Sequence, residues 1–236
     1  MTDSAADPLM VFDLDGTLVD TAGDLLDTLN VLMVREGLAA LPYSAVGSLV
    51  GAGARAMIER GFSANGAGLA QGRVDALLGD FIQHYGANIA ARSRPFPGVI
   101  AALDRLSAAG WRFAVCTNKL EGLSRRLLDE LGLTPRFAAV CGGDTFAVRK
   151  PDPGHLLGTI DKAGGAACRT IMVGDSKADI LAAQRAGIPV VAVTFGYTDE
   201  PVESFGPDRV IDHFDQLVDA AASLADRWRR PGCVAA

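Results

Sequence analysis

From residue 95 onward, short apolar runs alternate along the chain with segments whose apolar residues recur at helical spacing. The apolar runs are "RFAVCT", "AAVCGG", "TIMVGD" and "PVVAVT", and each ends at a polar residue or a glycine. Continuously apolar strands separated by helices are typical of a parallel sheet that helices cover on both faces. The segments at helical spacing are residues 99–109, 120–131, 153–163 and 177–186. A final helix is expected from Phe214 to about Arg229, with its inward face formed by Leu217, Val218, Ala221, Leu224, Ala225 and Trp228.

The segment between the first apolar run and residue 95 has a different pattern. The run "LMVF" at residues 9–12 resembles the later strands, so it is expected to join their sheet. Residues 21–92 carry helical periodicity, with apolar faces formed by Leu25, Leu26, Leu29, Leu32 and Met33, and by Val74, Leu77, Leu78, Phe81 and Ile82. We predict an α/β fold: a doubly wound parallel sheet forms a Rossmann-like core (residues 1–20 and 93–236), and an all-helical cap (residues 21–92) is inserted into it. The stretch "SRPFPG" is the expected return linker.

Composition and charge narrow the class of protein. The chain has 236 residues, of which 49% are hydrophobic and 21% charged, and its formal net charge is −6. This is enough apolar material for a sizeable core in one large or two modest domains, and the acidic balance disfavours a nucleic-acid partner. The basic residues Arg227, Arg229 and Arg230 are interpreted as a solvated helix end.

No segment predicts an export signal or a membrane span. The start "MTDSAADPLM" is short, polar and acidic, and no apolar run approaches the roughly 18 residues that would cross a bilayer. We therefore expect a cytoplasmic protein without a membrane partner; the sequence does not indicate whether it is a monomer or a homodimer. The four cysteines lack the spacing of a metal site and are interpreted as reduced thiols, mostly buried; they are Cys116, Cys141, Cys168 and Cys233.

Polar residues follow the predicted strands at the points where the strands end. Ligands of an open parallel sheet bind at the carboxyl ends of its strands, so these residues are the candidate site. The spacing places acids, a hydroxyl and one lysine around a single crevice. The residues are Asp13 and Asp15 after the first strand, Thr117 and Asn118 after the second, Asp175 and Asp179 after a later one, and Lys150 in the loop "RKPDP".

Four of these stretches form an ordered set. The motifs "DLDGTLVD", "CTN", "KPDP" and "GDSKADI" each follow a predicted strand. Together they resemble the four motifs of the haloacid-dehalogenase-like hydrolases, whose members with this pattern are mostly magnesium-dependent phosphatases. The resemblance covers the whole chain, including a helical cap between the first and second motifs. An isolated DxD pair is common on loops, whereas four ordered motifs are a specific signal.

The resemblance implies catalytic roles for four residues. Asp13 would attack the phosphorus of a phosphate monoester and form an aspartyl phosphate, and Asp15 would protonate the leaving alcohol and then activate water. Because nucleophile and substrate are both anionic, positive charge must offset their repulsion, and Lys150 would supply part of it. Thr117 and nearby backbone amides resemble the family's phosphate cradle.

The resemblance also implies a Mg²⁺ ion as cofactor. Magnesium prefers hard oxygen ligands, which Asp13, Asp175 and the backbone carbonyl of Asp15 would offer. Asp179 would ligate through water or orient Lys150.

Several residues keep two interpretations. Asp20 is interpreted as a helix N-cap rather than as a catalytic acid, and Asn118 would either cap the next helix or lie beside the substrate phosphate. His84, His155 and His213 are interpreted as structural residues.

The cap loop "VGAGARAMIERGF" contributes the candidate substrate-binding residues Gly51, Ala52, Gly53 and Arg55, and the alternative is a plain interhelical turn. This loop, the opening motif and "VTFGYT" look most like the phosphoglycolate phosphatases of the family, which implies 2-phosphoglycolate as the substrate. Phosphatases of sugar phosphates, nucleotides or pyrophosphate share nearly all of these features.

Three other functions stay open to comparison. A signalling receiver domain also carries a phosphoaccepting aspartate, but it requires neither the DxD pair nor a cap of roughly 70 residues. A haloacid dehalogenase displaces halide without protonating it, which would leave Asp15 without a task. A phosphomutase of the same family would return the phosphoryl group to a sugar, and only kinetics separates it from a hydrolase.

Overall fold

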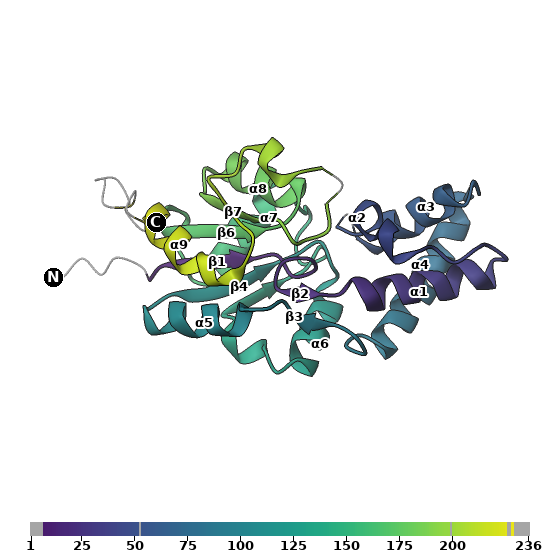
Figure 1. Cartoon of the computed structure of the whole chain (residues 1–236), viewed down its shortest axis with the longest axis horizontal. Helices are drawn as coiled ribbons and strands as arrows, with labels where there is room; N and C mark the ends of the chain where they lie inside the picture. The colour runs from purple at the N-terminus through teal and green to yellow at the C-terminus, as the bar shows by residue number, and fades with distance from the viewer. Residues whose placement is uncertain (1–6, 52, 199, 226–227, 229–236) are drawn as a thin grey trace.

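A six-stranded parallel sheet forms the centre of the molecule in the computed structural model (Figure 1), which describes residues 7–225 and 228 except 52 and 199. The strand order is β5-β4-β1-β6-β7-β8, and every neighbouring pair is parallel. The predicted doubly wound α/β class is therefore confirmed. The strands are β1 (Leu9–Phe12), β4 (Arg112–Cys116), β5 (Ala139–Cys141), β6 (Thr170–Gly174), β7 (Val190–Val193) and β8 (Arg209–Ile211).

Helices cover both faces of the sheet because the strands are apolar on both sides. In β1, Leu9 and Val11 pack into one apolar cluster and Met10 and Phe12 into the other, and all four side chains are buried. The first cluster is covered by α7 (Pro153–Lys162) and α8 (Lys177–Ala186). The second is covered by α5 (Val99–Ala108), α6 (Glu121–Glu130) and α9 (Leu217–Ala225).

The register of the sheet brings three strand ends together. Phe12 at the end of β1 lies opposite Val115 of β4 and Val173 of β6. Because parallel strands all end at the same edge, the loops after β1, β4 and β6 meet there. This edge is the one that faces the helical cap (Figure 1).

The cap lies between β2 and β3 in the chain and contains four α-helices among the described residues. They are α1 (Ala22–Arg35), α2 (Val46–Leu49), α3 (Ala54–Ala64) and α4 (Gln71–Ala87), with a 3-10 turn at Tyr43–Ala45. The predicted apolar face of α1 is buried, and that of α4 is buried at Val74, Leu77 and Phe81 and half-buried at Leu78 and Ile82. The cap's apolar residues belong to the same cluster as one face of the sheet.

Two short strands join the cap to the core. β2 (Val19–Asp20) and β3 (Arg94–Pro95) form an antiparallel pair. Next to them, the buried carboxylate of Asp24 accepts hydrogen bonds from the backbone N–H groups of Arg92 and Ser93 and from the Ser93 hydroxyl. These contacts tie the entry and exit of the cap to each other. The domain limits at residues 20/21 and 92/93 stay a prediction.

Some local predictions are wrong or incomplete. The edge strand β8 was not expected, because Arg209 and Val210 are exposed and the segment has no continuous apolar run. The final helix begins at Leu217, after a 3-10 turn at Phe214–Gln216, and its predicted end lies outside the described residues. The remaining 3-10 turns are Thr134–Arg136, Ala167–Arg169 and Val202–Phe205.

The predicted thiol state is correct for Cys116 and Cys141, which are free and buried. It is wrong for Cys168, which is disulfide-bonded, and Cys233 lies outside the described residues, as do Arg227, Arg229 and Arg230. The spacing of four scattered cysteines carries no signal for such a bond.

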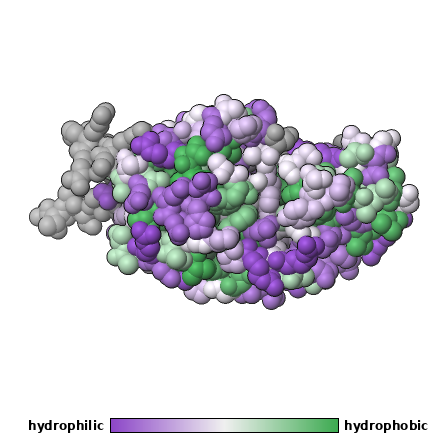
Figure 2. Space-filling view, viewed as in Figure 1, coloured by the Kyte–Doolittle hydropathy of each residue, from purple (hydrophilic) through white to green (hydrophobic). Residues whose placement is uncertain are grey.

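One face of the molecule shows how polar and apolar residues are distributed over the surface. On the face shown in Figure 2, hydrophilic residues are interspersed with hydrophobic ones over both the core and the cap. Among the described residues, no helix is long and apolar enough to cross a bilayer.

Candidate active site

Asp13 is held at the end of β1 by backbone and charge contacts. Its N–H donates to the carbonyl of Val173 on β6 at 2.9 Å, which continues the sheet ladder by one residue. Its carboxylate Oδ1 lies 2.9 Å from Nζ of Lys150, and the same Nζ lies 2.6 Å from Oδ1 of Asp179. One buried ammonium therefore neutralises part of the charge of two buried carboxylates.

Lys150 is fixed from both sides of its own backbone. Its N–H donates to Nδ1 of the buried His155 at 3.2 Å, and its carbonyl accepts from the Asn118 amide at 3.1 Å. Burial and the adjacent Lys150 lower the pKa of His155 to about 4, so this imidazole is neutral and can accept that hydrogen bond. The loop that carries Lys150 is thereby attached to the end of β4, where Asn118 lies.

Asp175 follows β6 and faces Asp13. Its Oδ1 accepts from the hydroxyl of Thr17 at 2.8 Å, and its Oδ2 accepts from the backbone N–H of Tyr197 at 2.7 Å. Two positions next to Asp175 require glycine. A Cβ on Gly196 would overlap the Asp175 Cβ, and one on Gly16 would overlap the Asp175 Oδ2. These contacts keep the carboxylate in one position.

Asp179 is positioned by the start of α8. Its Oδ2 accepts from the N–H and hydroxyl of Ser176, and the Ser176 hydroxyl accepts from the Asp179 N–H, which forms a capping box. Its other oxygen accepts from Nζ of Lys150 at 2.6 Å, and both predicted roles of Asp179, to ligate through water or to orient Lys150, stay predictions. Asp175 directly precedes Ser176, the N-cap of α8.

The three carboxylates repel one another in a buried site. Burial raises the pKa of Asp13 to about 6, against the lowering effect of Lys150 and with a further raising effect of Asp179. Burial, Asp13 and Asp179 together raise the pKa of Asp175 to about 8. The pKa of Lys150 is also raised, since the attraction of Asp13 and Asp179 outweighs the opposing effect of its burial. The cluster therefore carries negative charge that Lys150 alone does not neutralise.

The donor set fits a hard divalent cation. One oxygen from each of Asp13, Asp175 and Asp179 lies within 4.8 Å of the others. Oδ1 of Asp13 is buried and, within the described part of the chain, has no partner besides its ion pair with Lys150. Carboxylate oxygens at such spacing, with excess negative charge, are what magnesium sites in proteins offer. The backbone carbonyl of Asp15 stays a predicted fourth ligand.

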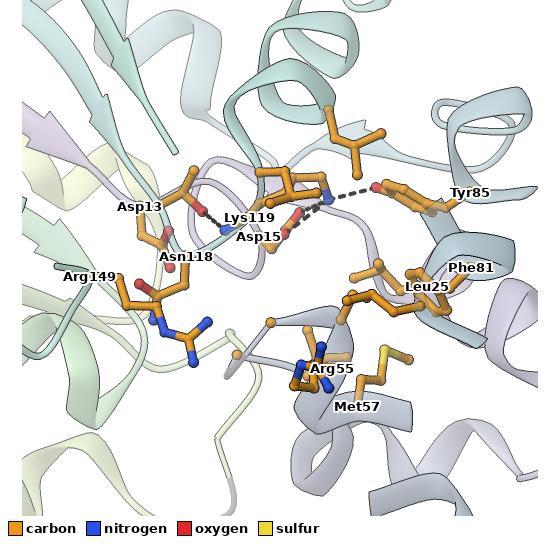
Figure 3. Close-up of a pocket in the computed structure, with 18 residues that line it drawn as sticks. Asp13, Asp15, Leu25, Arg55, Met57, Phe81, Tyr85, Asn118, Lys119 and Arg149 are labelled. Carbon is orange, nitrogen blue, oxygen red and sulfur yellow. Dashed lines mark hydrogen bonds and ion pairs between the residues drawn. The ribbon is translucent and has the colours of Figure 1, made fainter. Parts of the chain in front are cut away.

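Asp15 does not join this cluster; a second lysine binds it. Nζ of Lys119 lies 2.9 Å from Oδ1 and 3.0 Å from Oδ2 of Asp15, and it donates to the Tyr85 hydroxyl at 2.8 Å (Figure 3). Tyr85 comes from α4 of the cap, so the second DxD acid is linked to the cap through one ammonium. Burial raises the pKa of Tyr85 to about 12, so its hydroxyl is neutral.

Thr117 and Asn118 follow β4 and line the same cavity as Asp13. The Thr117 hydroxyl accepts from the backbone N–H of Lys119 at 3.2 Å, and Thr117 is 2% exposed. Asn118 does not cap α6, whose N-cap is Leu120 and whose first N–H donates to Asp144 instead. Of the two interpretations of Asn118, capping is therefore wrong. Its buried Oδ1 has no hydrogen-bond partner among the described residues.

The cap loop reaches this cavity. Gly51 and Gly53 have φ values of +100° and +90°, which favour glycine, and Gly53 is the N-cap of α3. Both glycines and Arg55 line the cavity, while Ala52 lies outside the described residues. The Arg55 guanidinium forms an exposed ion pair with Asp75. The cavity has a volume of about 160 Å³.

The structure adds lining residues that sequence reasoning missed. Lys119 directly follows the "CTN" motif and Arg149 directly precedes Lys150, so proximity to the motifs was the available signal. Tyr85 carried no signal, because helical periodicity marks it as a core residue of α4. Leu25, Met57, Phe81 and Leu123 complete an apolar wall.

The remaining predicted residues lie elsewhere. Asp20 is on β2 and the N-cap of α1 is Thr21, although the Asp20 carboxylate accepts from the Ala22 N–H. His84 contacts Thr28 between α1 and α4, and His213 pairs with Asp215 at the surface. Among the described residues that line the cavity, there is no histidine.

Comparison with known proteins gives a consistent result. The chain matches the family model for haloacid dehalogenase-like hydrolases over residues 10–193. It is 54% identical over 220 residues to the phosphoglycolate phosphatase of Agrobacterium fabrum (93% of this chain, 94% of that protein). It is 48% identical over 215 residues to that of Caulobacter vibrioides (91% of both). The crystal structure of a predicted phosphoglycolate phosphatase from Haemophilus somnus matches with a TM-score of 0.85 and 30% identity, covering 91% of this chain and 97% of that one.

Proposed function

The chain belongs to the haloacid dehalogenase-like hydrolases, and we propose that it is a magnesium-dependent phosphatase that hydrolyses 2-phosphoglycolate to glycolate and inorganic phosphate. The observation that carries this proposal is the division of two carboxylates between two lysines. Asp13 pairs with Lys150 beside the acidic cluster, whereas Asp15 pairs with Lys119 toward the cap. The two acids of one motif thus have different partners, which is consistent with separate roles for them in the reaction.

Asp13 is the proposed nucleophile. A carboxylate oxygen attacks phosphorus, the ester P–O bond breaks, and the phosphoryl group becomes an aspartyl phosphate on Asp13. Lys150 holds the carboxylate in place and reduces its repulsion of the anionic substrate. Asp13, Asp175 and Asp179 would hold the Mg²⁺ ion, which when bound supplies charge that stabilises the phosphoryl oxygens.

Asp15 is the proposed acid and base. In its protonated form it donates a proton to the oxygen of the leaving glycolate as the ester bond breaks, and the resulting carboxylate then takes a proton from the water that attacks the aspartyl phosphate. Hydrolysis regenerates Asp13 and releases inorganic phosphate. Asp15 lines the cavity together with Asp13, so both carboxylates can reach one phosphate ester bound there. Thr117 and Asn118, at the edge of the same cavity, are the proposed phosphate contacts.

The choice of phosphoglycolate rests on the relatives and on the cavity. Two relatives that share 54% and 48% of their residues with this chain carry that name. A cavity of about 160 Å³ is smaller than the pockets of roughly 300–1,000 Å³ that bind drug-sized ligands, which favours a substrate of few atoms. The cationic residues at its wall favour a leaving group with a negative charge.

A panel of phosphate esters tests this function. Phosphate release is measured with 2-phosphoglycolate, ethyl phosphate, a sugar phosphate, a nucleotide and pyrophosphate, with Mg²⁺ and with chelator. We expect the highest kcat/KM for phosphoglycolate and no turnover in chelator. Beryllium fluoride should label Asp13 alone. A different preferred ester would refute the substrate, a phosphorylated product without free phosphate would identify a mutase, and full activity in chelator would refute the metal.

A further inference from the structure

Three cationic side chains line the cavity, and one of them is enclosed. They are Arg55, Lys119 and Arg149. The side chain of Lys119 is 5% exposed, whereas that of Arg55 is 43% exposed and Arg149 is exposed at the surface. An enclosed cation interacts more strongly with a bound anion than an exposed one does, because little water screens it.

Each of the three N–H donors of the Lys119 ammonium has an acceptor. A lysine has three N–H donors, and the structure shows three acceptors: both carboxylate oxygens of Asp15, at 2.9 and 3.0 Å, and the Tyr85 hydroxyl, at 2.8 Å. Tyr85 also lies against the ammonium through its ring, with the centroid 4.3 Å from Nζ. The cap therefore holds this charge in place on one side, and Asp15 holds it on the other (Figure 3).

Catalysis must loosen one of these contacts. If the proposed function is correct, Asp15 turns an oxygen toward the ester oxygen of the substrate in order to deliver a proton. That turn releases one N–H of Lys119 at the position where the leaving group lies. In phosphoglycolate a single methylene separates the ester oxygen from the carboxylate, so the carboxylate arrives within reach of the group that contacts Asp15.

We infer that Lys119 determines specificity for the leaving group by binding the carboxylate of the substrate. The ammonium exchanges one contact with Asp15 for a contact with the substrate carboxylate, and Tyr85 fixes it from the cap side while this happens. Arg55 is less suited to the same contact, because its guanidinium already pairs with Asp75 at the surface of the cap. The inference deepens the proposed function and depends on it.

A purely structural role makes a different prediction. If Lys119 only balances the charge of Asp15, then its removal affects all phosphate esters equally. Ethyl phosphate is the matched comparison, because it replaces the carboxylate of phosphoglycolate by a methyl group and keeps the ester. Glycolate, the proposed product, tests the leaving-group site without any dependence on the chemical step.

The test is the variant Lys119→Met in the magnesium-loaded enzyme, with its fold checked by circular dichroism. We expect the ratio of kcat/KM for phosphoglycolate to that for ethyl phosphate to fall about 10- to 100-fold. Glycolate should inhibit ethyl phosphate hydrolysis by the wild type and lose this inhibition in the variant, while inhibition by inorganic phosphate persists. Lys119→Arg, which keeps the charge, should retain part of the glycolate inhibition.

Other outcomes separate the inference from the function on which it rests. Equal losses on the two esters, or unchanged glycolate inhibition, would overturn the role of Lys119 and leave the phosphatase assignment intact. A wild type that neither prefers phosphoglycolate nor responds to glycolate would overturn both.

A second variant covers the case in which Lys119→Met does not fold. Asp15→Asn keeps the shape of the site but removes the anion that competes for the ammonium. Calorimetry with glycolate, in the presence of Mg²⁺ and inorganic phosphate, should show binding about 10-fold tighter than in the wild type. Unchanged or weaker binding would contradict the inference.

Discussion

Replacing Asp13 by asparagine should abolish turnover and at the same time stabilise the metal-free protein. The amide keeps the shape of the side chain but carries no charge, so it cannot attack phosphorus. It also removes one of three buried carboxylates that repel each other in the absence of a cation. The same substitution is therefore expected to abolish function and to increase stability.

The size of the gain follows from the pKa of Asp13. Its value rises from 3.8 to about 6 in the folded protein, mainly through burial, and the side chain is 8% exposed. Because the folded pKa lies above the unfolded one, the stability that the protonated group contributes is complete below about pH 4 and is lost as the pH rises through 6. The difference between the two pKa values corresponds to about 3 kcal/mol at pH 8 and about 1.5 kcal/mol at pH 5.

Denaturant unfolding in chelator measures this difference. At pH 8 the free energy of unfolding of Asp13→Asn should exceed that of the wild type by about 3 kcal/mol, and the gain should shrink by about half at pH 5. Asp161→Asn, which neutralises an exposed aspartate on α7, is the matched control and should change stability by less than about 0.5 kcal/mol. If the Asp13→Asn variant is no more stable than the wild type at pH 8, or if it still releases phosphate, the reasoning is refuted.

Two further predictions concern the metal and the cap. Asp175→Ala should raise the Mg²⁺ concentration required for half-maximal rate about 10-fold or more, since Asp175 supplies one of the three clustered carboxylates. Phosphate release across a Mg²⁺ titration measures this requirement, and an unchanged value would argue against Asp175 as a ligand. Arg55→Ala should lower kcat/KM for phosphoglycolate and for an uncharged aryl phosphate by factors within about threefold of each other, because Arg55 pairs with Asp75 at the surface of the cap and Lys119 is the proposed contact of the substrate carboxylate; a loss confined to phosphoglycolate would assign that contact to Arg55.

The strands and helices of the core were predictable because each carries a strong periodic signal. The apolar runs that became β1, β4, β6 and β7 are buried on both faces, and burial on both faces leaves a continuous apolar segment in the sequence. β8 had no such signal, since two of its three residues are exposed at the edge of the sheet. Helical periodicity is also a local signal, and the predicted limits of α5, α6, α7 and α8 agree with the structure within one residue, whereas the final helix begins three residues later than predicted.

The residues of the site were predictable only in part. Asp13, Asp15, Thr117, Lys150, Asp175 and Asp179 lie in short motifs at strand ends, so their convergence follows from the parallel topology. The sequence did not reveal which lysine pairs with which acid. Lys150 binds Asp13 and Asp179, while Lys119 binds Asp15, and these pairs join residues separated by 29 to more than 100 positions in the chain.

The sequence by itself determined the alternation of strands and helices, the helical insertion and the acids that end the strands, because periodicity and motif spacing are local properties. Only the tertiary structure decided the environment of each acid. Asp15 contacts Lys119, and Lys119 contacts Tyr85 on α4 of the cap. Hydrophobic periodicity places Tyr85 on the buried face of that helix but does not reveal the polar contact of its hydroxyl. Long-range charge pairing depends on distances between elements that pack after they form, and no local pattern in the chain encodes those distances.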